Sequence, residues 1–498
     1  MALSPLRGFG GLFLFFSFDE VKIILSFLFA ILSLGALAQT VQVSSPSKLP
    51  GKAGKFRIQG KNNDGIIVRF YGQEDVINIF DESLKLVGSR ILDFKGESGL
   101  LQYIMLNKTG AVIFYLSQDK KYSVLLAQPV NSKFIEIGKP IVVDTIYDRR
   151  DLVATNLRFK PCIDQSYLMI YYPFFTSNAL ASVKMICVDR SVHSLYNKTI
   201  PLNRDEKQME DAKSLIDNNG NTYFILKPEA KADGSMYDVF RLSSAGDLNL
   251  YSFSTEKAIF GEPYFDLDNR NGNLVVNGFY NDNKRAEEVA NGFFYSSYNP
   301  ATGALIKTNY TAFTSDFIKE LTGRATTDKP KLYTFTIRRS VLRNDGGALI
   351  VAESFIKDTR ETPVQVGFQP GFGNYHTSYV YQFNDLITFS INPNGEMEWH
   401  SVMKKKQSSE DDNGVFSSFL TVNEKDKLRF LYLDDISTSG ILNQYTLTSD
   451  GKADRKAVLN MEEKDVMLLP KSGRQVAPNE AVIPSYMNGM LKLVKITY

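Results

Sequence analysis

A strand–turn–strand pattern recurs seven times along this chain of 498 residues. Each copy is a β-rich run of alternating polarity, a short polar turn and a second β-rich run. The clearest turns span residues 243–246, 299–303, 392–395 and 448–451, and weaker ones span 81–83, 129–132 and 189–191. Asn, Asp and Gly favour such turns because they tolerate positive φ, and Pro presets a suitable φ. The chain is therefore expected to be almost entirely β-structure.

A second set of turns opens the strand that precedes each copy, near residues 64, 109, 165, 219, 272, 346 and 426. The first four intervals between these turns are 45 to 56 residues long, and the last two are 74 and 80. Propeller blades of four strands repeat about every 40 to 50 residues. The sequence thus predicts an all-β fold: one β-propeller domain over residues 39–498, with seven blades of four-stranded antiparallel sheets. A large β-sandwich is the alternative.

The two long intervals place insertions near residues 313–330 and 357–378. The first contains a predicted helix over residues 314–323, with Phe317 and Leu321 on one face and Gly323 as its stop. The second insertion is expected to widen the loop between the two inner strands of the sixth unit.

Residues 490–496 form a further predicted strand after the turn at Asn488 and Gly489. A propeller must join its last blade to its first, because an open ring exposes strand edges. We therefore expect residues 490–496 to pair with strands from the N-terminal 60 residues of the mature chain. The alternative is that this strand finishes its own blade.

The first 38 residues have the pattern of a secretory signal peptide. Residues 23–34 carry no charge, Lys22 precedes them, and residues 36–38 (Ala-Leu-Ala) form a small-x-small cleavage site. Asp19 and Glu20 fit this signal badly, so residues 1–20 are either a gene-model extension or part of an unusually long signal. The apolar run is shorter than the about 20 residues that a membrane span needs. We expect a soluble periplasmic or secreted protein that begins at Gln39.

The net charge of the chain is +2, and no basic tract stands out. This balance gives no electrostatic reason to expect DNA or RNA as a partner. The short run of lysines at residues 404–406, followed by acids at 410–412, is expected to be solvated loop. The predicted partner is an envelope glycan, peptide or protein, bound by a monomer.

Two cysteines occur, Cys162 and Cys187. If residues 166–173 and 181–189 pair as a hairpin, Cys187 lies opposite a residue near Leu168, several residues from Cys162. That separation exceeds the Cα limit of about 7 Å for a disulfide. Two separate buried thiols are therefore expected.

Three segments of the C-terminal third carry a family resemblance: residues 345–353, 379–386 and 395–399. They resemble uncharacterised exported β-propeller-like proteins of Gram-negative bacteria, a group with no assigned activity. The resemblance implies the propeller fold and export, and no ligand. The turn at residues 299–303 is similar to quinoprotein-type propeller repeats, but Ile306 stands where those repeats have tryptophan. A quinone cofactor is therefore not expected.

The sequence contains no G-x-S-x-G, H-E-x-x-H, C-x-x-C or phosphate-loop motif. One turn has oxygen donors that suit calcium, a cation that collects six or more oxygens: Asp266, Asp268 and Asn271. However, Gly272 is displaced by one residue from its place in the usual calcium loop, and Arg270 occupies a ligand position. The alternative is a polar β-turn that leads into the strand at Leu274. No other cofactor is predicted.

The candidate ligand-binding segment is residues 371–381, which are rich in aromatic side chains and glycine. Aromatic faces with polar tips are typical of sugar and peptide recognition surfaces. The predicted contact residues are Phe372, Tyr375, His376, Tyr379 and Tyr381. The alternative is that Tyr379, Tyr381 and Phe383 alternate on one strand as blade core.

Three functional classes fit these observations. A non-enzymatic binding or scaffolding propeller of the cell envelope is favoured, because the chain shows repeats and no catalytic motif. A propeller that cleaves glycans or peptides with carboxylates from several blades is the second, since sequence cannot reveal such a site. The third is a surface-interaction protein without a small ligand. The side chains that line the propeller axis distinguish them.

Overall fold

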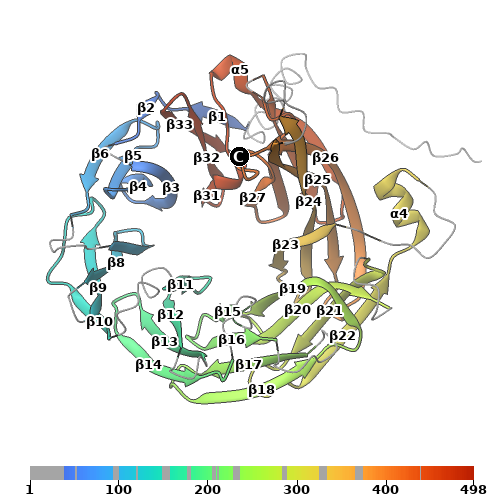
Figure 1. Cartoon of the computed structure of the whole chain (residues 1–498), viewed down its shortest axis with the longest axis horizontal. Helices are drawn as coiled ribbons and strands as arrows, with labels where there is room; N and C mark the ends of the chain where they lie inside the picture. The colour runs from blue at the N-terminus through green and yellow to red at the C-terminus, as the bar shows by residue number, and fades with distance from the viewer. Residues whose placement is uncertain are drawn as a thin grey trace, which may run out of the picture.

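The computed structural model describes residues 39–50, 53–93, 100–118, 122–147, 157–175, 181–204, 209, 212–227, 236–282, 289–324, 332, 334–364, 374–437 and 439–498. Within these ranges, the strands form eight antiparallel sheets around a central axis (Figure 1). The predicted β-propeller is confirmed and the sandwich alternative is wrong. The number of blades is eight, not the predicted seven.

The first four blades each contain four strands. Blade 1 has β3 (Ala53–Asn62), β4 (Gly65–Gly72), β5 (Val76–Phe80) and β6 (Leu86–Ile91). Blade 2 has β7 (Leu100–Leu106), β8 (Gly110–Gln118), β9 (Ser123–Asn131) and β10 (Ile141–Ile146). Blade 3 has β11 (Arg158–Pro161), β12 (Tyr167–Phe175), β13 (Ala181–Asp189) and β14 (Ser194–Pro201). Blade 4 has β15 (Lys213–Ile216), β16 (Thr222–Leu226), β17 (Met236–Leu242) and β18 (Leu248–Ser254).

The next three blades follow the same plan. Blade 5 has β19 (Ala258–Asp268), β20 (Asn273–Asn281), β21 (Gly292–Tyr298) and β22 (Leu305–Ala312). Blade 6 has β23 (Phe335–Leu342), β24 (Ala348–Val364), β25 (Asn374–Ile391) and β26 (Met397–Glu410). Blade 7 has β27 (Phe419–Asn423), β28 (Lys427–Leu433), β29 (Ile441–Thr448) and β30 (Ala453–Asn460). These seven blades are the seven units that the turn pattern predicts.

Blade 8 contains strands from both ends of the described chain. It combines β31 (Arg474–Ala477), β32 (Glu480–Met487) and β33 (Met490–Thr497) with β1 (Thr40–Val43) and β2 (Ser47–Lys48). Strand β33 pairs with β1 from Thr40↔Thr497 to Val43↔Val494. The predicted pairing of residues 490–496 with the N-terminal region is confirmed. The closing strands form a blade of their own, which explains the eighth sheet.

Polar side chains stabilise several of the turns. In blade 1, Asn62 Oδ1 accepts hydrogen bonds from the N–H groups of Asp64 (2.9 Å) and Gly65 (3.1 Å). Because neighbouring strands run in opposite directions, the turn between the first and second strands and the turn between the third and fourth lie on one face of the propeller. We call this the turn face.

The hydrophobic core lies between the blades. In β4, Ile66, Val68 and Phe70 belong to a cluster with Leu491 and Leu493 of blade 8. Ile67 of the same strand belongs to a cluster with residues of blade 2. Alternate side chains therefore pack against opposite neighbours, which is why such strands are apolar on both faces.

First strands of neighbouring blades contact each other, including β3 with β7 and β31, and β15 with β11 and β19. They are therefore the innermost strands, and they surround the axis (Figure 1).

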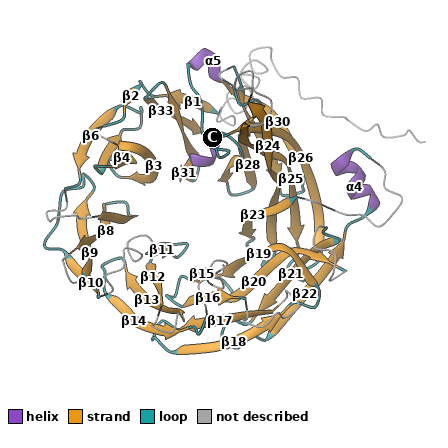
Figure 2. Ribbon diagram, viewed as in Figure 1, coloured by secondary structure: helices purple, strands orange, loops and turns teal. Residues whose placement is uncertain are grey.

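In the described part of the chain, short helical segments accompany the strands: α4 (Ser315–Thr322), α5 (Met461–Lys464) and the 3-10 helix η1 (Pro470–Ser472). Figure 2 shows α4 on the outside of the ring. Thr314 caps the helix by accepting a hydrogen bond from the Phe317 N–H, and Gly323 ends it in the left-handed conformation. The predicted helix over residues 314–323 is confirmed.

The second insertion is mainly strand. Strands β24 and β25 stay paired from Ala348↔Ile391 to Val364↔Asn374, so only residues 365–373, which lie outside the described part, separate them. The expectation of a widened loop over residues 357–378 is wrong, because a continued ladder satisfies the backbone N–H and C=O groups of both segments.

The lysine run also lies in a strand, β26, and its prediction as solvated loop is wrong. Strand alternation turns Lys404 and Lys406 outward and Lys405 inward, where its side chain is fully buried. The Lys405 ammonium donates to Glu353 Oε1 (2.8 Å), to the Phe383 carbonyl (2.8 Å) and to Gln407 Oε1 (2.7 Å). All three donors are satisfied, which permits its burial.

Cys162 and Cys187 are both buried and both free. Cys187 lies opposite Met169 in the β12–β13 ladder, next to the expected partner position. Burial raises the pKa of Cys162 to about 11 and that of Cys187 to about 12, so both remain thiols.

No helix in the described part of the chain is long and apolar enough to cross a membrane.

Candidate functional site

The residues of the predicted aromatic segment lie in different environments in the structure. Phe372 lies outside the described residues, and Tyr375 pairs with Pro363 in the β24–β25 ladder. His376 is exposed, and Tyr379 is 42% exposed. Tyr381 is buried, and its hydroxyl donates to Asn413 Oδ1 (2.9 Å). Tyr381 is therefore part of the blade core, which was the alternative to ligand binding. Ligand binding by His376 and Tyr379 stays a prediction.

The predicted calcium ligands follow one another along β19 and its turn. Asp268 Oδ1 accepts a hydrogen bond from the Arg270 N–H (3.1 Å), and Asn271 Oδ1 accepts one from the Asn273 N–H (2.9 Å). Burial raises the pKa of Asp266 to about 6. These bonds are those of a polar turn. The described residues contain no group of three or more His, Cys, Asp or Glu that could hold a metal ion, and calcium at this turn stays a prediction.

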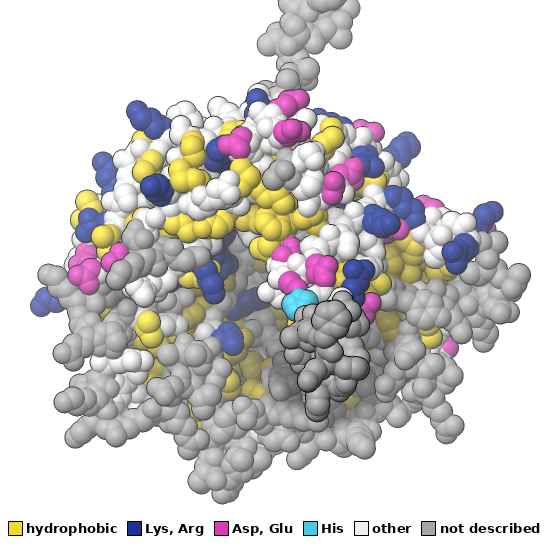
Figure 3. Space-filling model, turned by 45° about the horizontal axis from the view of Figure 1, so that its top comes forward, with side chains coloured by type: hydrophobic (Ala, Val, Ile, Leu, Met, Phe, Trp, Pro, Cys, Tyr) yellow, Lys and Arg dark blue, Asp and Glu magenta, His cyan; other side chains and the backbone are white. Residues whose placement is uncertain are grey.

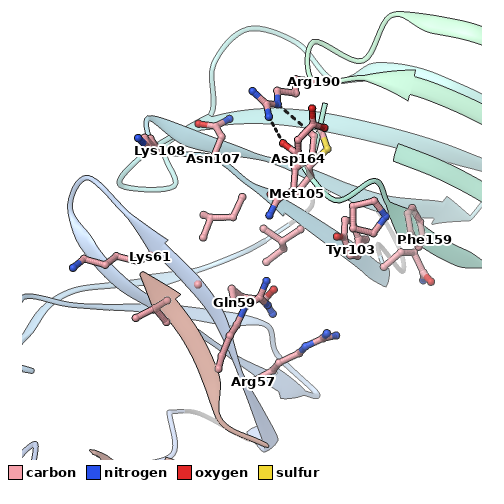
Figure 4. A pocket seen from close by; sticks show the side chains of 18 of the residues that line it. Arg57, Gln59, Lys61, Tyr103, Met105, Asn107, Lys108, Phe159, Asp164 and Arg190 are labelled. Atoms are coloured by element: carbon pink, nitrogen blue, oxygen red, sulfur yellow. Dashed lines mark hydrogen bonds between the residues drawn. The ribbon is translucent and has the colours of Figure 1, made fainter. Parts of the chain in front are cut away.

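A different site emerges beside the propeller axis, on the turn face. A cavity of about 1080 Å³ lies there, walled by the first strands of four consecutive blades, β31, β3, β7 and β11. Turns of blades 2 and 3 complete the wall (Figure 4). We call this space the axial cavity.

The lining of the axial cavity is strongly basic. Among the described residues, the lining contains one acid, Asp164, and six basic residues: Arg57, Lys61, Lys108, Arg158, Arg190 and Arg474. Figure 3 shows Lys and Arg side chains inside the central hollow of the molecule. A concave site lined by one sign of charge concentrates ions of the opposite sign. The cavity therefore favours an anion, although the chain as a whole is close to neutral.

Lys61 and Arg190 are held in place by contacts within the protein. The Lys61 ammonium lies 2.7 Å from Glu480 Oε2 and 2.6 Å from Glu82 Oε1. The Arg190 guanidinium donates to the carbonyl oxygens of Gln165 and Asp164 (Figure 4). These two side chains hold the wall together.

Arg57 and Arg474 have no carboxylate partner among the described residues. Arg474 is partly buried and donates from Nη1 to the Ile58 carbonyl (3.4 Å). Burial, together with the nearby charge of Arg57, lowers the pKa of Arg474. Two guanidinium groups that repel each other gain most from a shared anion, which each can bind through two parallel N–H donors.

An aromatic pair lies on the wall beside these arginines. The rings of Tyr103 and Phe159 are parallel within 5°, with centroids 5.2 Å apart, and both side chains are half-buried. Burial raises the pKa of Tyr103, while the charges of Arg474 and Arg57 act in the opposite direction. The phenol is therefore neutral and available as a hydrogen-bond donor.

Five described amide residues also line the axial cavity: Gln59, Gln102, Asn107, Gln165 and Gln475. Asn107 uses its Oδ1 within its own turn, where it accepts from the Thr109 N–H (2.9 Å). No hydrogen bond of the Gln59 side chain is formed within the described part of the protein, and this side chain lies beside Arg57 in Figure 4. The arrangement can bind a ligand that carries acidic groups, hydroxyl groups and an apolar face.

Sequence reasoning did not find this site. Arg57 and Arg474 are far apart in the chain, and each lies on an innermost strand without a motif. A usable signal was the Lys and Arg content of the first strands β3, β11 and β31, but it becomes visible only once the ring order is known.

Comparisons with known proteins do not identify a family for this chain. No protein-family model and no curated protein matches this chain. Similar solved structures include a protein of unknown function from Bacteroides caccae, with 11% identity, TM-score 0.27, and coverage of 70% of this chain and 93% of that one. Another is an acylaminoacyl peptidase from Pyrococcus horikoshii, with 7% identity, TM-score 0.36, and coverage of 90% and 57%. A Synechocystis apocarotenoid oxygenase mutant has 8% identity, TM-score 0.34, and coverage of 85% and 94%. Likenesses at this level indicate no ligand or activity for this chain.

Proposed function

We propose that this chain is an exported binding propeller of the cell envelope that takes an anionic ligand into its axial cavity. The observation that carries the proposal is the pair Arg57 and Arg474, which meet in the cavity without a carboxylate partner among the described residues. Two neighbouring guanidinium groups without a counter-charge lower the free energy of unfolding, and a bound anion offsets that loss.

Binding is favoured over cleavage by the kind of side chain in the cavity. Hydrolysis of a glycosidic bond needs two carboxyl groups about 5 to 10 Å apart. The described lining contributes one, Asp164, whose Oδ1 already accepts from the Ser166 N–H (2.9 Å). The aromatic pair and the amides instead supply the contacts of a recognition site.

Export is proposed from the sequence alone. Residues 1–38 have the features of a signal peptide, and the exported chain is expected to begin at Gln39. An envelope location would give the protein access to acidic polymers outside the cell.

Calorimetry on the mature chain tests the binding proposal. Polygalacturonate serves as the anionic ligand and maltotetraose as the neutral one. The variant Arg57→Gln/Arg474→Gln is expected to lose on the order of 100-fold in affinity for the anion, because charge-assisted hydrogen bonds each contribute about 1.5 to 3 kcal/mol. Affinity of the unmodified protein should also fall as salt is added.

The matched control is Lys85→Gln/Arg324→Gln, which removes the same charge from exposed positions outside the cavity lining. It should bind as the unmodified protein does. If both double variants lose the same affinity for polygalacturonate, the loss is due to net charge and not to the cavity. Maltotetraose that binds as tightly as polygalacturonate would contradict the proposal.

A further inference from the structure

A second, smaller cavity adjoins the axial cavity. Its volume is about 340 Å³, and its walls come from β11, β15 and β19. Pro161 lines both cavities, so they meet at β11 close to the axis. Together they form a path along the innermost strands of blades 8, 1, 2, 3, 4 and 5.

Cations continue along this path. On β11, Arg158 lines the axial cavity and Lys160, two residues further, lines the smaller one. Two residues of an extended strand cover about 7 Å. Lys160 is exposed, and its ammonium makes no ion pair within the described residues. The carboxylate found among the described lining residues of the smaller cavity is Asp266, and the charges of Lys160 and of Arg339 on β23 partly balance it.

We propose that the smaller cavity is a second subsite for the ligand of the axial cavity, and that this ligand is a chain-shaped acidic glycan. The inference rests on the proposed function and extends it. A small inorganic anion fills neither the volume of the axial cavity nor a second subsite beyond β11.

The neutral side chains of the path select the class of ligand. Sugar rings present an apolar face that suits Tyr103 and Phe159, and their hydroxyl groups suit Gln59 and the neutral Tyr103 phenol. An acidic peptide would meet the same cations but would use the aromatic pair and the amides less. The combination therefore favours a polymer of uronic acid units.

A length series tests the second subsite. The probes are galacturonate, digalacturonate and tetragalacturonate, titrated into the mature protein at constant salt. Tetragalacturonate is expected to bind at least tenfold more tightly than galacturonate, because only the longer chain reaches both cavities. The variant Lys160→Gln should weaken tetragalacturonate binding by on the order of tenfold and leave galacturonate binding unchanged.

Lys198→Gln is the matched control, since Lys198 is an exposed lysine on β14 of the same blade and lines neither cavity. It should bind every probe as the unmodified protein does. Thermal unfolding of both lysine variants checks that the blade is intact.

Each outcome separates the two proposals. Equal affinity for all three chain lengths, or equal effects of Lys160→Gln on all three, would refute the second subsite even if the Arg57→Gln/Arg474→Gln variant loses binding. Tetraglutamate that binds as tightly as tetragalacturonate would refute the glycan class. If neither acidic sugars nor tetraglutamate respond to the arginine variant, the proposed function itself is wrong.

Discussion

Residues in the left-handed conformation explain why some turns of the repeat lack glycine. In blades 4, 6 and 7, the fourth residue of the turn between the third and fourth strands is a glycine with positive φ: Gly246, Gly395 and Gly451. In blades 1, 2 and 3, the same position holds Leu84, Phe134 and Val192, with φ between 59° and 67°. Both groups of turns have the same backbone hydrogen bond, from the N–H of the fourth residue to the carbonyl of the first. For example, the Leu84 N–H donates to the Asp81 carbonyl (3.0 Å).

These three side chains are buried, with 1% to 7% exposure. A left-handed backbone costs a non-glycine residue roughly 1 to 2 kcal/mol, whereas burial of a large apolar side chain contributes about 1.5 to 3 kcal/mol. Packing therefore outweighs the backbone preference. A search for Gly or Asn at this position misses turns in which the core dictates the residue.

The buried pair Glu353 and Lys405, with the half-buried Arg338 beside it, yields a prediction about stability. Glu353 is fully buried and lies 2.8 Å from Lys405 Nζ and 3.0 Å from Arg338 Nε. Burial lowers the pKa of Lys405. The variant Glu353→Leu leaves a buried ammonium without its carboxylate, so we expect the free energy of unfolding to fall by about 3 to 5 kcal/mol in urea titrations.

The double variant Glu353→Leu/Lys405→Met removes both buried charges and should regain part of that loss. If the double variant is no more stable than Glu353→Leu, the lysine is not the source of the cost.

At the scale of elements, amphipathic periodicity and caps predict helix α4 correctly, whereas the extension of β24 and β25 into residues 357–364 and 374–378 is not predicted. Helix α4 packs on blades 5 and 6: the Phe317 ring lies 6.0 Å from that of Phe389 and 4.9 Å from the ring of His400. Its buried residues are Phe317, Ile318 and Leu321. An eight-residue helix is unstable alone, so this contact holds it.

We predict that Phe317→Ala undocks α4 without unfolding the ring. Loss of a buried phenylalanine costs about 3 to 5 kcal/mol, which exceeds what a short helix can supply. Hydrogen exchange of residues 315–322 should accelerate on the order of 100-fold or more, while the strands of blade 6 keep their protection. The control is Lys319→Ala, on the exposed face of the same helix. It should change neither the exchange of residues 315–322 nor that of the blade 6 strands.

At the scale of the whole molecule, strand β33 closes the ring. It pairs with β32 on one side and with β1 and β2 on the other, and Leu491, Leu493, Val494 and Ile496 are fully buried. The closing blade has no complete sequence unit, because its strands come from both ends of the described chain. That is why the repeat pattern yields seven units and the molecule has eight sheets.

Deletion of residues 490–498 is therefore expected to lower the melting temperature by more than about 10 °C, since a loss of 1 kcal/mol moves a large domain by about 2 to 4 °C. Deletion of residues 39–43, which removes only the edge strand β1, should lower it less. A truncated protein that melts within about a degree of the full chain would contradict the closing role of β33.

The sequence by itself determined the fold class, seven of the eight blades, the helix and the closing strand, because these depend on local turn chemistry and on the period of apolar residues. The tertiary structure decided the burial of Lys405, the separation of Tyr379 from Tyr381, and the site. Arg57, Tyr103, Phe159 and Arg474 come from four innermost strands that are distant in sequence. They meet only because closure of the ring brings the first strands of blades 8, 1, 2 and 3 around one cavity.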